Sequence, residues 1–184
     1  MARTATTLAA ALLAASSLAS AAFASGDGHD HDHGEEAREL GAHVHGHGTI
    51  TIAIEGDAVV MELGLPGAST VGFEHMPESD EQRAMVNDAI ATLSDPMNVF
   101  AIPAEAGCTV TEAGAELHQD GTHNEFEVEY AMTCADTGAL TSIDTMLFER
   151  FDALEELEIE FATPLGQGAT ELERGDTTIS LATS

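Results

Sequence analysis

Two runs of alternating apolar and polar residues predict a β-hairpin at the start of the apolar part of the chain. In residues 49–55, isoleucine recurs at every second position, and in residues 59–65 valine, methionine and leucine do the same. Such alternation is typical of strands with one buried face. Gly56-Asp57 lies between the runs and suits a tight turn.

One later segment has the signals of an amphipathic helix. Ser79 suits the N-cap, Gln82 occupies the capping-box position, and acidic residues follow the cap. Asp95-Pro96 is expected to end the helix. The apolar residues at helical spacing, which we expect to be buried, are Met85, Ala89, Ile90 and Leu93.

The remainder of the chain is mainly strand in pattern. An Asp120-Gly121 turn separates two alternating runs, residues 108–117 and 124–134, and residues 156–161 alternate leucine, isoleucine or phenylalanine with glutamate. Short strands are also expected near residues 140–146, 172 and 179. About seven or eight short strands and one main helix predict an α+β, mainly β domain, as an antiparallel sheet or a sandwich.

The N-terminal part of the chain is predicted to contain a signal peptide followed by a mobile arm. Residues 1–24 combine one positive charge, a short Ala/Leu core and an Ala22-Phe23-Ala24 cleavage pattern, which together predict a signal peptide. Residues 25–42 contain almost nothing apolar and predict a mobile arm. Residues 43–184 are expected to form a single domain, and no other apolar stretch is long enough to cross a bilayer.

Composition narrows the possible partners and compartment. The chain has 33 Asp and Glu against 5 Lys and Arg, for a formal charge of −28, which excludes nucleic acid and anionic membranes. The acidity fits adaptation to a salty habitat, or else a field that attracts cations. Cys108 and Cys134 fit an oxidising compartment, where a bridge would stabilise the fold by about 3 kcal/mol. The alternative is a pair of thiolate metal ligands.

Histidine is the main chemical signal. Six of the nine histidines lie in the runs HDHDH and HVHGH between positions 29 and 47, and imidazole is a leading ligand for zinc and copper. If the first strand begins as early as residue 43, then His43, His45 and His47 share its outer face and approach a common ion. His29, His31 and His33 lie in the arm and are interpreted as a loose collecting segment.

Three further histidines are scattered. His75 stands in a loop beside Glu74, and His123 opens a strand whose outer face carries Glu125 and Glu127, where a His/carboxylate zinc site is conceivable. His118 lies across the same turn as His123 and gives only a weak signal. A solvated or structural role is the alternative for each of them.

Catalytic motifs are lacking. The sequence has no HExxH, GxSxG, P-loop or Rossmann glycine pattern, so no enzyme is expected. The histidines most simply indicate a protein that captures zinc. Three alternatives remain: a periplasmic copper chaperone, a zinc metalloenzyme with an open coordination position, and a salt-adapted structural protein. The scattered methionines argue against Cu(I).

Several motifs in matching order resemble those of the ZrgA-like periplasmic zinc-uptake proteins. They are HVHGHGTITIAIEGDAVVMELGLPG, VGFEHMP at 71–77, a helix ending near LSDP, AGC at 106–108, HNEFEVEYAMTC at 123–134, LFERF at 147–151 and TPLGQGATEL at 163–172. The resemblance covers nearly all of the chain after the predicted signal peptide. It implies a non-enzymatic periplasmic protein of Gram-negative bacteria that binds Zn²⁺ and assists a zinc ABC importer.

The resemblance also carries over particular residues. The histidines that match the family are His43, His45, His47, His75 and His123, and Cys108 and Cys134 match its cysteine pair. We expect the HVHGH histidines to supply the first zinc ligands, with His75, His123 or Glu74 completing the shell. Relatives often carry a long His/Asp tract in the hairpin before the position of His123, whereas this hairpin has only residues 119–122.

Overall fold

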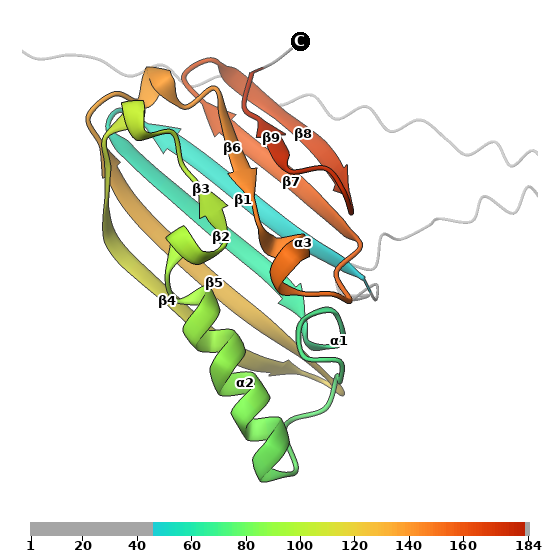
Figure 1. Cartoon of the computed structure of the whole chain (residues 1–184). Coiled ribbons are helices and arrows are strands. Elements are labelled where there is room, and N and C mark those ends of the chain that lie inside the picture. Colours follow the sequence, from blue (N-terminus) through green and yellow to red (C-terminus); the bar gives the residue numbers. More distant parts are fainter. Residues whose placement is uncertain (1–45, 183–184) are drawn as a thin grey trace, which may run out of the picture. The chain divides into compact units, whose positions relative to one another are not determined.

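Six strands form the larger of two sheets in the computed structural model, which describes residues 46–182 (Figure 1). Neighbouring strands are antiparallel, except that β1 and β7 run parallel. The order across the sheet is β4 (Cys108–Asp120), β5 (His123–Cys134), β2 (Ala58–Pro66), β1 (His47–Glu55), β7 (Glu156–Thr163) and β8 (Gly166–Glu173).

One face of this sheet, called the inner face below, forms the core. Its residues are the apolar members of the alternating patterns, and they are buried because every second side chain of a strand points the same way. They include Ile50, Ile52, Ile54, Met61, Leu63, Leu65, Phe126, Val128, Tyr130, Met132, Leu157, Ile159 and Phe161. The strand alternation predicted from the sequence is therefore confirmed.

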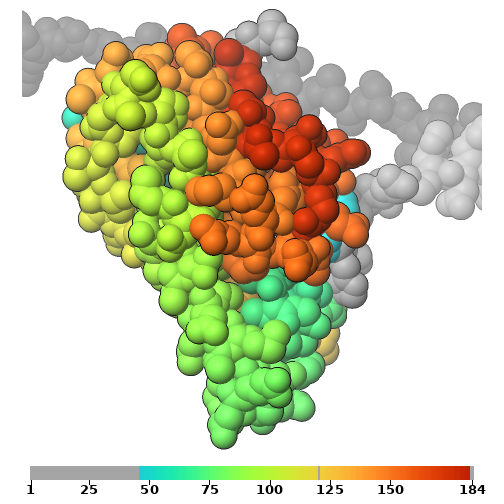
Figure 2. Space-filling model, viewed as in Figure 1, coloured from blue at the N-terminus to red at the C-terminus, as the bar shows by residue number. Residues whose placement is uncertain are grey.

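A small sheet and the helices cover the inner face (Figure 1). The small sheet consists of β3 (Phe100–Ala101), β6 (Ser142–Thr145) and β9 (Thr178–Ser180). The helices are α1 (Gly67–Thr70), α2 (Asp80–Leu93) and α3 (Leu147–Arg150), with 3-10 turns η1 (Pro96–Asn98), η2 (Ala104–Ala106) and η3 (Thr137–Ala139). Figure 2 shows these segments as the visible surface of that side.

The predicted fold class is confirmed, with nine strands in residues 46–182 and one main helix. Within the same residues, no helix is long and apolar enough to span a membrane.

The main helix begins where its cap was expected. The Ser79 side chain accepts a hydrogen bond from the Gln82 backbone N–H, and the helix ends at Leu93. The buried stripe differs from the prediction, however, since Met85 is 43% exposed and Val86 is buried with Ala89 and Leu93. The sequence pattern allowed both faces, and the one that packs on the sheet excludes Met85.

The Tyr130 side chain connects the sheet with the end of α2. Its hydroxyl donates a hydrogen bond to the Leu93 carbonyl, one of the helix's last carbonyls, and its ring packs edge-on against Phe100. Burial raises the pKa of Tyr130, and Asp95 adds to the shift. This contact fixes how α2 lies on the inner face.

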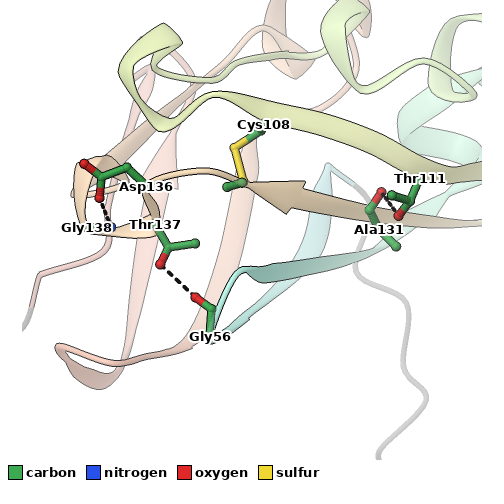
Figure 3. Close-up of a disulfide and its surroundings, with 8 residues drawn as sticks. Gly56, Cys108, Thr111, Ala131, Asp136, Thr137 and Gly138 are labelled. Carbon is green, nitrogen blue, oxygen red and sulfur yellow. Dashed lines mark hydrogen bonds between the residues drawn. A yellow bond between two sulfur atoms is a disulfide. The ribbon is translucent and has the colours of Figure 1, made fainter.

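A disulfide closes one end of the β4–β5 hairpin (Figure 3). Cys108 and Cys134 are paired directly across the two strands, so the predicted bridge is confirmed and the thiolate-ligand alternative is excluded for this state. A register shift follows between Val110 and Glu112, where the Thr111 hydroxyl donates to the Ala131 carbonyl. The turn at the other end of the hairpin includes Gly121, whose φ is 60°.

Candidate metal centre

The second face of the six-stranded sheet, called the outer face below, is strongly acidic. Its glutamates occupy the alternate positions left by the core residues: Glu62, Glu112, Glu116, Glu125, Glu127, Glu129, Glu156, Glu158, Glu160, Glu171 and Glu173. An open groove of about 690 Å³ runs over β1, β2, β5 and β4 on this face. Such a field raises the local concentration of cations.

Arginine does not neutralise this face within residues 46–182. Arg83 pairs with Asp80 on α2, Arg150 donates to the Asn98 carbonyl, and Arg174 donates to carbonyls of the segment around α3. The sequence has no lysine. Histidines are therefore the remaining basic side chains that stand among the outer-face carboxylates.

His47 is the described member of the HVHGH run, and it lies on the outer face as predicted. It is half-buried, and its Nδ1 is 3.4 Å from Glu156 Oε1 on the neighbouring parallel strand. Gly46 has a φ of 84°, so the strand begins at His47 and regular alternation does not extend back through Gly46. His43 and His45 lie outside the described residues, as do His29, His31 and His33 of the arm.

Glu74 and His123 come together although 49 positions separate them. His123 is the first residue of β5, and its Nδ1 is 3.0 Å from Glu74 Oε2 in the loop before α2. A carboxylate accepts hydrogen bonds, so Nδ1 of His123 is the donor in this contact. A carboxylate that orients a histidine in this way is a regular feature of zinc sites.

A buried asparagine holds the loop beside this pair. Asn124 is 1% exposed, and its Nδ2 donates to the His75 carbonyl at 2.6 Å. A Cβ on Gly67 would lie 1.6 Å from Asn124 Oδ1, so only glycine permits this approach. The ring of His75 stacks on Phe73, and its Nδ1 donates to the Met76 carbonyl at 2.8 Å, so Nε2 is the ring nitrogen that could bind a metal.

A chain of contacts links the start of β1 to the same end of the sheet. The buried Gly46 N–H donates to Ser69 Oγ in α1 at 2.9 Å, and α1 begins at Gly67 against Asn124. The backbone that enters His47 and the loop that carries His75 are thus both fixed on α1. We call this region, with His47, Glu74, His75 and His123, the sheet-end region.

A third group of ligand-type side chains combines His118, which gave only a weak signal in the sequence, with Glu127 and with Glu116, which was not among the candidates. The ligand atoms of Glu116, His118 and Glu127 all lie within 4.8 Å of one another on β4 and β5, and all three residues are exposed. His118 Nε2 is 2.9 Å from Glu116 Oε1 and 3.5 Å from Glu127 Oε2. The hydrogen bond to Glu116 raises the pKa of His118, and Glu127 adds to the increase.

This group could have been found from the predicted turn. A two-residue connection at positions 121–122 fixes the hairpin register, which places Glu116 opposite Glu127 and His118 opposite Glu125. Glu127, one of the two outer-face carboxylates that the sequence suggested for His123, therefore lies beside His118. His123 is instead paired with Glu74.

Comparison with known proteins supports the resemblance noted from the motifs. Residues 42–181 match the model of the ZrgA family zinc uptake protein. No curated protein matches the sequence significantly. Because the match spans the described domain and most of the chain, the protein belongs to the ZrgA family of zinc uptake proteins.

Proposed function

We propose that this protein captures Zn²⁺ in the periplasm of a Gram-negative bacterium and assists zinc import by an ABC transporter, without catalysing a reaction. The family match supports a role in zinc uptake. Residues 1–24 have the pattern of a signal peptide, and the Cys108–Cys134 bridge suits an oxidising compartment. In this proposal Zn²⁺ is the cargo.

The observation that carries the proposal is the contact between Glu74 and His123, which joins two of the candidate ligands from segments 49 positions apart. In the sheet-end region, Nδ1 of His75 donates to the Met76 carbonyl and Nδ1 of His123 donates to Glu74, and in this proposal each ring binds Zn²⁺ through Nε2. His47 starts β1 at the same end, through the Gly46–Ser69 contact. Residues 43–184 act as one zinc-binding domain in which His43, His45 and His47 supply the first ligands.

His75, His123 or Glu74 complete the coordination. Glu74 would act either as a direct ligand or by orienting His123 through the 3.0 Å contact. Imidazole nitrogens and a carboxylate oxygen form a donor set that tetrahedral Zn²⁺ accepts. Because Zn²⁺ binds neutral imidazole, protons compete with the ion and binding weakens as the pH falls.

The arm has a separate proposed role. His29, His31 and His33 collect ions loosely, because residues 25–42 contain too little apolar sequence to fix a geometry. The acidic outer face assists by concentrating cations near the domain. Ordered binding then takes place on the domain and not on the arm.

Calorimetry tests this proposal with two matched triple variants of the processed chain, residues 25–184. Replacing His43, His45 and His47 by alanine should abolish tight Zn²⁺ binding at neutral pH. The control variant, in which His29, His31 and His33 are alanine, should keep it. Tight binding that survives in the first variant, or an unaltered chain that binds no Zn²⁺, would overturn the proposal.

A further inference from the structure

The geometry points to a second Zn²⁺ site on the outer face, formed by Glu116, His118 and Glu127, on the β4–β5 hairpin next to His123 of the sheet-end region. Two residues come from β4 and one from β5, so the paired backbones of the hairpin fix their spacing. All three ligand atoms lie within 4.8 Å of one another. This site goes beyond the proposed function, because it uses none of the ligands assigned there.

The spacing of the ligand atoms fits a tetrahedral zinc ion. Ligands about 2.0 to 2.2 Å from tetrahedral Zn²⁺ lie about 3.3 Å from one another. His118 Nε2 lies 2.9 Å from Glu116 Oε1 and 3.5 Å from Glu127 Oε2, on either side of that value. Small side-chain rotations therefore suffice to admit the ion, with water as the fourth ligand.

The atoms that bind the ion are already turned toward one another. Nε2 now shares a proton with Glu116, and Zn²⁺ would replace that proton between the same two atoms. A neutral ring does this by moving its proton to Nδ1, and a protonated ring by releasing one proton to water. The carboxylates of Glu116 and Glu127 change from hydrogen-bond acceptors to ligands.

Electrostatics also favours a cation at this place. Glu116 stands directly opposite Glu127, and like charges at opposite positions of paired strands repel. The three arginines in residues 46–182 have their partners elsewhere in the fold. A divalent ion between the carboxylates relieves the repulsion, and the imidazole favours Zn²⁺ over Ca²⁺ and Mg²⁺.

The same face contains a matched pair without a histidine. Glu158 stands directly opposite Glu171 on β7 and β8, and both are exposed. This pair has the charge and strand geometry of Glu116 and Glu127 but no imidazole between its members. Diffuse attraction by the acidic face would affect both pairs equally, whereas a site affects only the pair with His118.

The test is a Zn²⁺ titration of the processed chain followed by NMR of the histidine ring signals. The His118 ring should shift with saturation, both in the unaltered chain and in the variant with His43, His45 and His47 changed to alanine. The double variant Glu116→Gln/Glu127→Gln should weaken the His118 response about tenfold or more. The control Glu158→Gln/Glu171→Gln should leave it unchanged.

These outcomes separate the second site from the proposed function. A His118 response that persists in the histidine triple variant supports the second site, whatever happens to tight binding. A His118 ring that does not respond to Zn²⁺, or that loses its response equally in both glutamine variants, overturns it. Backbone amide spectra of each variant verify that the domain is folded.

Discussion

The inner and outer faces of the six-stranded sheet come from the same strands but differ in composition: the inner face is apolar and buried, and the outer face is acidic and exposed. On β5, Phe126, Val128 and Tyr130 are buried, while Glu127 and Glu129 between them are exposed. The inner face contains the apolar packing that stabilises the fold. The outer face contains charged side chains that contribute little to stability and are available for ion binding.

The difference teaches where this protein tolerates change. Substitutions on the inner face should alter stability, while those on the outer face should alter ion binding in a domain that stays folded. The two roles meet at the sheet-end region, where the buried Asn124 holds the His75 loop through a hydrogen bond. A change at that point should affect stability and zinc binding together.

The largest effect is expected from Gly67→Ala. The new Cβ would lie 1.6 Å from Asn124 Oδ1 and 2.6 Å from the Phe73 carbonyl oxygen, so backbone or Asn124 must move. We expect a loss of about 3 kcal/mol in the free energy of unfolding, measured in urea, and weaker zinc binding.

Gly114→Ala is the matched control on the outer face, because a Cβ there meets nothing within 4 Å. It should change the free energy of unfolding by less than about 0.5 kcal/mol. Equal effects of the two alanines would show that the close approach of Gly67 to Asn124 does not constrain the fold.

Removing the disulfide should lower stability about as much as Gly67→Ala, but without weakening zinc binding. Cys108 and Cys134 are 26 positions apart, and changing both to alanine releases the unfolded chain from this cross-link. The free energy of unfolding should therefore fall by about 3 kcal/mol. The bridge lies at the end of the hairpin opposite to the turn, so the Zn²⁺ response of His118 should persist under folding conditions. If the folded variant loses the His118 response to Zn²⁺, the hydrogen bonds between β4 and β5 do not hold the hairpin register without the disulfide.

Tyr130→Phe should cost about 1 to 2 kcal/mol, because the buried Leu93 carbonyl loses its donor. The pKa of Tyr130 is raised, so the folded state disfavours the phenolate and stability falls as the pH rises above about 10. The phenylalanine variant should lose that part of the alkaline dependence. Urea unfolding at neutral and alkaline pH measures the loss of stability and its pH dependence. The control is Glu129→Gln, a neighbour on the outer face, which should leave the free energy of unfolding unchanged.

The smallest effect concerns the ionisation of His118 in the zinc-free chain. The Glu116 hydrogen bond raises the pKa of His118, so protonated His118 favours the folded state at low pH, and this contribution disappears as the pH rises through the raised pKa. NMR titration of the ring should give a value above 6.5. Glu116→Gln should bring it closer to 6.5, and an unchanged value would show that the contact is absent in solution.

The sequence was informative wherever a local pattern decides the structure. Turn residues and alternation predicted the β1–β2 and β4–β5 hairpins, and the Ser79 cap placed the start of α2. The cysteine pair was predicted as a disulfide, and the hairpin register explains why the two residues meet. These features rest on near neighbours in the chain, which a single sequence reveals.

Features that join distant segments were not predictable in the same way. The parallel pairing of β1 with β7 brings His47 to Glu156, about a hundred positions away, and no local pattern encodes it. The contact between Glu74 and His123 likewise needs the folded loop. Met85 was placed on the wrong side because tertiary packing, and not periodicity, selects the face of α2.

The most direct test of the central claim is a crystal structure of the processed chain loaded with Zn²⁺, with the metal located by anomalous scattering. We predict a fully occupied zinc ion at the sheet-end region, bound by imidazoles from the HVHGH run together with His75, His123 or Glu74. Zinc bound only to outer-face glutamates, or no zinc within reach of His47, His75 and His123, would contradict the account.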